Sequence, residues 1–248
     1  MRTIKFISIF ILLCGFTFAL VQCTKDENGV NTPNPDKTIE LRESSNCIDT
    51  TYLNSVCSKG VFSWAISLPQ YPGCTFWVDV PYYFCYGLTA TSMHVGDYKI
   101  VEHDCQDYND DANDAFNNGM LEIFTINFDK SVWHAINVYL MTHLPPQVTT
   151  HLELNYYTAS CAKTCYVIVG KPGEIQGIIP HRYNCGEKCC KLITVYRKIN
   201  GVWKIESQSY LPNNDPCTGS LSVICPRGTT YSTDCIVNCD GLRSLYIP

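Results

Sequence analysis

Residues 74–86 read CTFWVDVPYYFCY, and this stretch decides the fold class that the sequence predicts. From position 76 onward, the even-numbered positions carry only aromatic or β-branched side chains: Phe76, Val78, Val80, Tyr82, Phe84 and Tyr86. Alternation with a period of two is typical of a β-strand that buries one face. Because proline has no backbone N–H to donate to a sheet, we expect Pro81 at a sheet edge or at a bulge.

Similar patterns predict further strands on both sides of this stretch. A short apolar run occupies residues 62–66, and strands are expected over residues 88–103 (with a break at Gly96–Asp97), 149–157, 165–169, 191–199 and 202–210. The last two flank Asn200–Gly201, a dipeptide that suits the positive-φ positions of a type I′ turn, so they predict a hairpin. Beyond Pro212 the composition predicts an irregular tail held by cysteines.

Between these strands, residues 107–144 change period and predict two helices with a break near residues 127–130. Apolar residues recur at helical spacing in two sets, the first being Phe116, Met120, Ile123 and Phe124, and the second Val132, Ile136, Tyr139, Leu140 and His143. Pro145–Pro146 is expected to end the second helix. The predicted fold is therefore α+β: an antiparallel sheet of hairpins with an inserted helical pair.

Cysteine is unusually frequent, with 16 residues in the chain. Apart from Cys14 and Cys23 near the N-terminus, these are Cys47, Cys57, Cys74, Cys85, Cys105, Cys161, Cys165, Cys185, Cys189, Cys190, Cys217, Cys225, Cys235 and Cys239. An even number in an exported chain predicts a framework of six or seven disulfides. Zinc is disfavoured because the chain has no Cys-x2-Cys pair. The adjacent Cys189 and Cys190 are expected to bridge to two different partners, and no thiolate is left for catalysis.

The N-terminus has the pattern of an export signal. Arg2 and Lys5 precede an uncharged apolar run, residues 6–20, which is too short for a typical membrane span. The next residues, Leu20-Val21-Gln22-Cys23, resemble a bacterial lipobox, and Thr24-Lys25-Asp26-Glu27 resembles the export tag of surface lipoproteins of the Bacteroidota. The resemblance implies that Cys23 is lipidated and anchors the protein in the outer membrane or at the cell surface. The alternative is an ordinary cleaved signal and a periplasmic or secreted protein.

These features divide the chain into a signal peptide (residues 1–22), a polar tether (23–46) and a single disulfide-stapled domain (47–248). From Pro72-Gly73-Cys74 to Cys185 and Cys189-Cys190, the spacing resembles that of a group of uncharacterised cysteine-rich exported bacterial proteins. That resemblance implies no activity.

Neither the charge nor the motifs commit to a chemistry. A net charge of −5 predicts no nucleic-acid partner. Of the histidines His94, His103, His134, His143, His151 and His181, two share the predicted helical region, but nine residues separate them and place them on opposite faces. The acidic group Asp104, Asp107, Asp110, Asp111 and Asp114 is expected to cap a helix and to form a solvated face rather than bind calcium. We therefore expect no metal, no cofactor and no catalytic residue.

Aromatic residues remain the best candidates for a binding surface. Trp77 and Tyr83 share the odd-numbered face of the predicted strand and are the candidates for an exposed sugar-stacking platform. The predicted function is non-catalytic, in adhesion, envelope structure or binding, with the lipid bilayer and a glycan or surface protein as partners. The alternative is a secreted hydrolase whose site is assembled from scattered residues. A cleft with convergent histidines and carboxylates would favour the enzyme, and a flat aromatic strip would favour binding.

Overall fold

The computed structural model describes residues 47–48, 50–87, 91–169, 177–185, 188–212, 217, 223–237 and 239–247. Its helices are α2 (Thr50–Val56), α3 (Gln106–Asn117), α4 (Leu121–Thr142) and α5 (Asp240–Arg243). Its strands are β1 (Ser58–Leu68), β2 (Tyr71–Tyr86), β3 (Thr91–Val95), β4 (Lys99–His103), β5 (His151–Ala159), β6 (Cys161–Val169), β7 (Gly177–Asn184), β8 (Cys189–Ile199), β9 (Val202–Leu211), β10 (Thr229–Ser232) and β11 (Ile236–Val237). The fold is α+β and rich in disulfides, as predicted.

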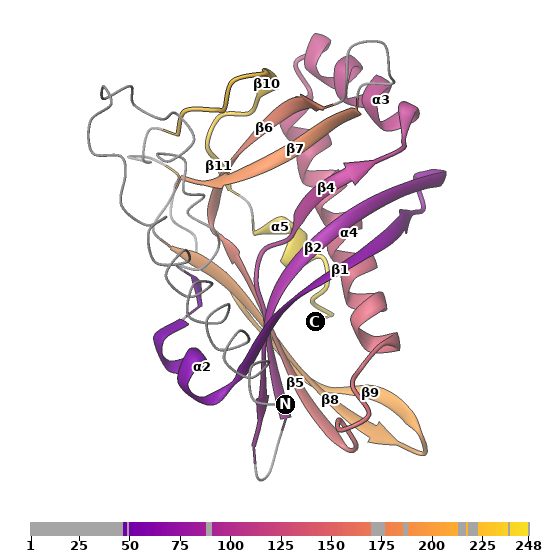
Figure 1. Ribbon diagram of the computed structural model, residues 1–248, viewed down its shortest axis with the longest axis vertical. Helices are drawn as coiled ribbons and strands as arrows, with labels where there is room; N and C mark the ends of the chain where they lie inside the picture. The colour runs from indigo at the N-terminus through magenta and orange to yellow at the C-terminus, as the bar shows by residue number, and fades with distance from the viewer. Residues whose placement is uncertain are drawn as a thin grey trace, which may run out of the picture. The chain divides into compact units, whose positions relative to one another are not determined.

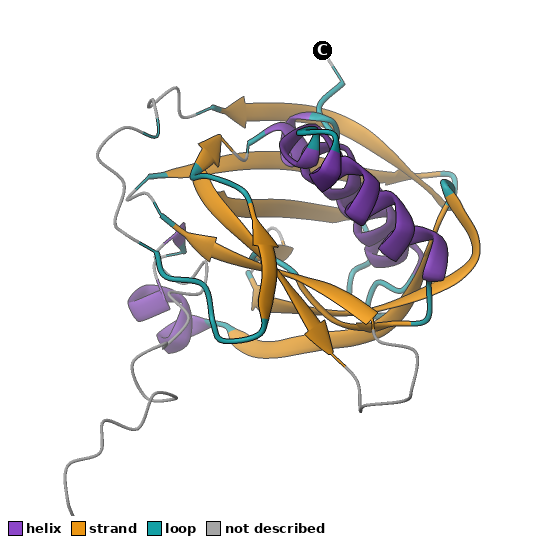
Figure 2. Ribbon diagram, turned by 90° about the horizontal axis from the view of Figure 1, so that it is seen from above, coloured by secondary structure: helices purple, strands orange, loops and turns teal. Residues whose placement is uncertain are grey.

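The larger sheet has seven strands in the order β1-β2-β3-β5-β8-β9, and β4 pairs with β2 beside β3 (Figure 1). Neighbouring strands are antiparallel except β3 and β5, which run parallel. The parallel pair follows from connectivity, because α3 and α4 lie between these strands in sequence and carry the chain back to the same end of the sheet. The strands of this sheet curve around the long helix α4 (Figure 2).

The predicted central strand is confirmed as β2. Its even-numbered residues face the core, and Phe76 and Val80 are each 0% exposed. Tyr82 is half-buried, and the residues near the two ends, Pro72 and Tyr86, are exposed. Alternating hydrophobicity is thus a sufficient signal for the face of this strand that packs on the helices.

The position of Pro81 differs from the prediction, because β2 is an interior strand and carries no bulge at this residue. The Pro81 carbonyl accepts a hydrogen bond of 2.8 Å from the Gly96 N–H, so both its carbonyl and its nitrogen point toward β3. Gly96 lies just after β3, which ends at Val95, and β4 begins at Lys99. The missing donor of Pro81 therefore faces a break in the ladder, where a lost hydrogen bond costs little.

The predicted helical pair exists, but the predicted break near residues 127–130 is wrong. The chain leaves α3 at Asn118 and turns at Gly119, whose φ of +68° favours glycine. Phe128 and Asp129 are instead buried in the middle of α4. The second predicted stripe is largely correct, since Val132, Ile136 and Leu140 are buried.

The first predicted stripe is wrong. The break after α3 changes the helical phase between its members, and Phe116, Met120 and Ile123 are 46%, 51% and 55% exposed. The actual core of this region is aromatic. Tyr108 on α3 makes an edge contact with Phe76 at 5.5 Å between ring centroids and a tilted contact with Phe128 at 4.7 Å.

The predicted hairpin of β8 and β9 is confirmed. Asn200 and Gly201 have φ values of +53° and +82°, as a type I′ turn requires. The tail beyond Pro212 is more ordered than predicted. Its described part contributes β10 and β11 to a second sheet, in which β6 pairs with β7, β10 and β11, and it ends in the short helix α5.

Seven disulfides use all 14 cysteines that follow Cys23. They are Cys47–Cys189, Cys57–Cys85, Cys74–Cys105, Cys161–Cys217, Cys165–Cys225, Cys185–Cys235 and Cys190–Cys239. The adjacent Cys189 and Cys190 bridge to different partners, as expected. A framework of this density forms in an oxidising compartment, so the protein is extracellular or periplasmic. Within the described part of the chain, no helix is both long and apolar enough to cross a bilayer.

Alkylation of the denatured, unreduced domain should label none of these 14 cysteines, because each sulfur is bonded to another. Reduction before alkylation should label all of them, as counted by intact mass. The reduced sample is the control for reagent access. Two or more labelled sites among the 14 without reduction would contradict the framework.

Candidate functional site

The two predicted aromatic candidates lie on the sheet face that is turned away from the core, but they do not form one platform. Trp77 is 39% exposed and Tyr83 is half-buried. Six residues separate them along β2, which corresponds to roughly 20 Å. Trp77 lies opposite Ala65 on β1 and Glu102 on β4, so neither of its cross-strand neighbours is aromatic.

Tyr83 belongs to a row of side chains that crosses five neighbouring strands on this outer face. It lies opposite Lys59 of β1 on one side and His94 of β3 on the other. The His94 Nδ1 atom is 3.1 Å from the Tyr157 hydroxyl on β5, and the two rings are stacked with centroids 6.0 Å apart. The Lys191 ammonium of β8 lies 5.0 Å from the centroid of the Tyr157 ring.

We call these five residues, Lys59, Tyr83, His94, Tyr157 and Lys191, the outer row. Four inter-strand spacings give it a length of roughly 19 Å. Lys59 is exposed and the other four are half-buried, so the rings are held in place by their neighbours while part of each remains accessible. The row presents two phenol rings, one imidazole and two ammonium groups on a single strip of sheet.

The pKa of His94, at the centre of the outer row, lies below its ordinary value. Burial lowers its pKa, the Lys191 charge lowers it further, and Glu153 partly opposes both. The imidazole is therefore neutral at pH 7, with one ring nitrogen as donor and the other as acceptor. Ser92 lies 3.4 Å from its Nε2 atom. The positive charge of the row is thus confined to its two ends.

A groove of about 570 Å³ lies between β1 and α4, at the opposite edge of the sheet from β9. Its volume falls within the range of about 300–1,000 Å³ that is usual for small-molecule sites. The lining is mostly apolar and consists of Ala65, Ile66, Ser67, Pro69, Gln70, Ser131, His134, Ala135, Val138, Tyr139 and Thr142. Tyr139 is held by stacking on Trp64, with ring centroids 4.1 Å apart.

A smaller cavity of about 160 Å³ lies between α4, the strands β5, β8 and β9, and the C-terminal segment. Its polar centre is Asn137, whose Oδ1 atom accepts hydrogen bonds from the Tyr156 hydroxyl at 2.6 Å and the Tyr196 hydroxyl at 3.3 Å. His134 lines both this cavity and the groove. Among the described residues, no carboxylate lines either of them, so the described lining does not bring together the histidine and acid that the hydrolase alternative requires.

Carboxylates converge instead in a buried charge cluster that sequence reasoning missed. Arg182 of β7 donates to Asp129 of α4 at 2.6 Å and lies 3.0 Å from Asp97. Tyr98 donates its hydroxyl to Asp129 at 2.7 Å, and its ring lies 5.0 Å from the guanidinium carbon. Thr158 of β5 accepts from Arg182 at 3.2 Å and donates to Asp97 at 3.0 Å. The cluster joins the second sheet, the helix and the main sheet.

Burial controls the protonation of this cluster. It raises the pKa of Asp129 to about 6, although the Arg182 charge opposes the rise. Burial likewise raises the pKa of Asp97, again against Arg182. Burial alone would lower the pKa of Arg182, but the two carboxylates more than offset it, so the guanidinium stays charged. The cluster is therefore a structural ion network that gains a proton in mild acid.

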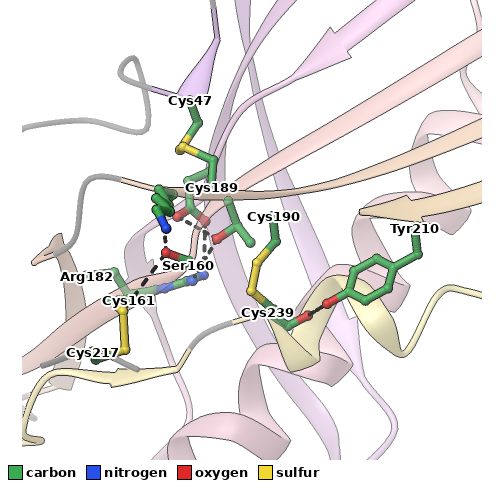
Figure 3. The surroundings of a disulfide bond; sticks show 12 residues. Cys47, Ser160, Cys161, Arg182, Cys189, Cys190, Tyr210, Cys217 and Cys239 are labelled. Carbon is green, nitrogen blue, oxygen red and sulfur yellow. Dashed lines mark hydrogen bonds and ion pairs between the residues drawn. A yellow bond between two sulfur atoms is a disulfide. The ribbon is translucent and has the colours of Figure 1, made fainter. Parts of the chain in front are cut away.

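Two disulfides lie beside the cluster. Thr158 is directly opposite Cys190 in the sheet, so the cluster is adjacent to the Cys190–Cys239 bridge (Figure 3). The next position pairs with Cys189, which bridges to Cys47. Cys239 precedes α5, where Gly241 packs so closely that a Cβ atom would collide with the Asp129 carboxylate and the Trp133 ring.

The sulfur atoms of Cys161, Cys217 and Cys235 lie within 4.8 Å of one another, which is compatible with a metal site. Each of them is bonded in a disulfide, Cys161 to Cys217 and Cys235 to Cys185. Metal binding by cysteine needs the thiolate, so these sulfurs offer no ligand in the oxidised protein.

The predicted capping of α3 by the acidic group is wrong. The N-cap residue is Cys105, and no side chain caps the helix. Asp104 instead accepts a hydrogen bond of 2.6 Å from the Thr75 N–H, and Asp111 accepts one of 3.0 Å from the Tyr71 hydroxyl. These two carboxylates therefore tie α3 and its start to β2.

The histidines outside the outer row are dispersed. His103 is buried and lies 2.9 Å from the Ile178 carbonyl oxygen, which joins β4 to β7. His143 stacks on Tyr139 at the end of α4, and His151 lies 3.9 Å from Glu206 at the surface. Only His94 and His134 border a candidate binding surface.

Comparison of the chain with protein-family models, with curated proteins and with solved structures gives no match.

The replacement Asp129→Asn should change how stability depends on pH. The pKa of Asp129 is about 6 in the folded protein and 3.8 in its ordinary state, so the folded protein binds the proton more tightly. Its contribution to stability is full below about pH 4 and is lost as the pH rises through 6. The unfolding free energy of the wild type relative to Asp129→Asn should therefore fall by roughly 3 kcal/mol between about pH 4 and pH 7.

Urea unfolding of the oxidised proteins at both pH values measures this difference. Asp234→Asn, at an exposed position, controls for the loss of a carboxylate as such. A difference between wild type and Asp129→Asn that stays constant or grows with pH would contradict the assignment.

Proposed function

We propose that the protein is an exported, lipid-anchored, non-catalytic binding protein that holds an acidic glycan on its outer row. The observation that carries the proposal is the strip formed by Tyr83, His94 and Tyr157 with a lysine at each end. An aromatic strip of this kind on a sheet face supports a binding role rather than catalysis in a cleft.

The aromatic centre of the row suits sugar rings. A phenol ring offers an apolar face to the C–H groups of a sugar and a hydroxyl to its hydroxyl groups. Tyr83 and Tyr157 are half-buried, so little side-chain freedom is lost on binding. His94 adds a neutral donor and acceptor between them.

The two ends of the row favour acidic sugars. Lys59 and Lys191 place positive charge at both ends of a strip roughly 19 Å long, where carboxylate or sulfate groups of an extended chain would meet them. The chain as a whole is acidic, with a net charge of −5, so the charge of the row is a local feature rather than part of a general basic surface.

Two observations support a non-catalytic role. His94 contacts Ser92 and Tyr157 rather than a carboxylate that would orient it as a general base. The carboxylates Asp97 and Asp129 are instead neutralised by Arg182 in the interior. The histidine of the outer row and the carboxylates of the interior therefore lie in separate places and do not form one acid–base site.

The anchor is proposed from the sequence and the bridges together. The disulfide framework requires export. The lipobox-like Leu20-Val21-Gln22-Cys23 and the polar run after it lie outside the described residues. Acyl chains on Cys23 would hold the domain at the outer membrane or cell surface, where glycans are encountered, because each buried CH2 contributes about 0.8 kcal/mol.

Tyr157→Ala and Tyr83→Ala should each weaken binding of polygalacturonate by about tenfold, since each removes one stacking ring. Lys59→Gln with Lys191→Gln should remove the preference for polygalacturonate over neutral dextran. Isothermal titration of the oxidised domain measures both effects.

Tyr246→Ala is the matched control, because Tyr246 packs on the core side of the sheet against Tyr210. Lys204→Gln, at an exposed position on β9, controls for charge. Equal affinity of the wild type and Tyr157→Ala for polygalacturonate, or failure of the wild type to bind it or chondroitin sulfate, would overturn the proposed ligand class.

Cys23→Ala should move the protein from the membrane fraction to the soluble fraction of the producing cell, because the acyl anchor is lost. The intact mass of the wild type should exceed that of residues 23–248 by the acyl chains. Cys14→Ala, within the signal, is the matched control. An unchanged membrane fraction for Cys23→Ala would rule out the anchor.

A further inference from the structure

The free edge of the main sheet is β1, and its outward-facing backbone groups can be identified from the register. The Gly96 N–H donates to the Pro81 carbonyl, so the backbone groups of Pro81 point toward β3 and away from β1. Backbone groups alternate in direction along a strand. Because Val61, Ser63 and Ala65 lie opposite Pro81, Asp79 and Trp77, their own N–H and C=O groups point outward from the sheet.

These outward-facing groups are unpaired. Within the described part of the chain, β1 pairs only with β2, and no other backbone hydrogen bond reaches Val61, Ser63 or Ala65. Residues 60–68 read GVFSWAISL and contain no charged residue and no proline. Natural sheet edges usually carry such residues because they block pairing with another chain. The edge of β1 is therefore open and unprotected.

The apolar groove lies directly beside this edge. Ala65 and Ile66 form its β1 wall, and Ala135, Val138 and Tyr139 form its α4 wall. Val138 is 62% exposed at the rim. Ser131 and His134 add polar groups on the helix side. Figure 1 shows β1 as the outermost strand beside α4.

We propose that this edge and groove together bind an extended peptide segment, which adds to β1 as a further strand. Its backbone would complement the outward N–H and C=O groups of Ser63 and Ala65, and one apolar side chain would enter the groove against Val138 and Tyr139. Addition of a strand at a sheet edge is an established mode of peptide recognition, in which backbone hydrogen bonds give affinity and a pocket gives specificity.

The hydrogen-bonding pattern of the β1 edge indicates which kind of ligand fits it. A ladder of alternating donors and acceptors spaced two residues apart matches an extended peptide backbone, and neither an acyl chain nor a sugar presents that pattern. The neighbouring apolar groove matches a side chain on every second residue of such a peptide. The site is separate from the outer row, so it does not depend on glycan binding.

The probe is a peptide of six alternating threonine and valine residues followed by one lysine for solubility. Its N-terminus is acetylated and its C-terminus is amidated. Two matched peptides carry N-methyl groups on alternate backbone amides. One is methylated at the odd-numbered residues and the other at the even-numbered residues. Titration against the oxidised domain should show binding of the parent peptide and binding at least about tenfold weaker for one N-methylated phase.

Amide hydrogen exchange gives a second measurement. The bound peptide should slow exchange of the Ser63 and Ala65 amides. The amides of Phe62 and Trp64, which face β2, serve as the internal control. Slowing at Phe62 and Trp64 alone would contradict the site.

Val138→Asp should weaken the peptide at least about tenfold by placing a charge in the groove. Ile123→Asp, at an equally exposed position on α4, should leave affinity within about twofold. Tyr157→Ala should leave it unchanged, which separates this site from the outer row.

Three results would overturn the proposal. The first is no binding of the parent peptide at millimolar concentration. The second is equal binding of the parent and both N-methylated peptides, which would indicate an apolar small-molecule site. The third is a dimer in sedimentation that Val138→Asp dissociates, which would assign the edge to a second copy of the chain.

Discussion

The ion pair between Arg182 and Asp129 fixes the second sheet, helix α4 and the main sheet relative to one another. It connects β7 of the second sheet to α4 at 2.6 Å, and Tyr98 and Thr158 bring the main sheet to the same point. Removing Arg182 would cost about 3–5 kcal/mol, because the carboxylates of Asp97 and Asp129 would be left buried without a compensating charge. Burial raises the pKa of both Asp97 and Asp129, and the charge of the single Arg182 guanidinium offsets the rise only in part.

This arrangement explains where binding surfaces are available. The concave face of the sheet is filled by α4 and by aromatic side chains such as Tyr108, Trp133 and Tyr156, each 0% exposed. Among the described residues, the core side of the sheet holds a small cavity of about 160 Å³ beside Asn137. The outer row lies on the outer face of the main sheet, and the groove lies at its edge beside β1.

Local sequence patterns predict the parts of this structure that depend on local physics. The face of β2, the turn at Asn200–Gly201 and the presence of two helices each follow from periodicity or from a backbone preference within a few residues. The helix break was misplaced for a physical reason. The polar residues near Asp129 resemble a loop, but Asp129 is stabilised inside α4 by Arg182, which lies 53 residues away in the chain. No local pattern contains that partner.

The candidate sites show the same limit. The parity of β2 places Trp77 and Tyr83 on the outer face, but it does not reveal that Tyr83 has His94 as its neighbour and Trp77 has Glu102. The outer row exists because β3 runs parallel to β5 after a crossover of two helices, and only that topology brings Tyr157 to His94. Similarly, the apolar run at residues 62–66 indicates a strand but not that it forms the sheet edge.

The distribution of disulfides is consistent with this division between interior and surface. Four bridges, Cys161–Cys217, Cys165–Cys225, Cys185–Cys235 and Cys190–Cys239, close loops of 49 to 60 residues and hold a C-terminal segment whose strands β10 and β11 have only 4 and 2 residues. In the chain-entropy model, a single bridge that closes a loop of this length stabilises the folded state by about 4 kcal/mol, because it restricts the unfolded chain. In this C-terminal segment, disulfides thus provide stability where short strands make few backbone hydrogen bonds. Among the described residues, no cysteine lines the groove beside β1.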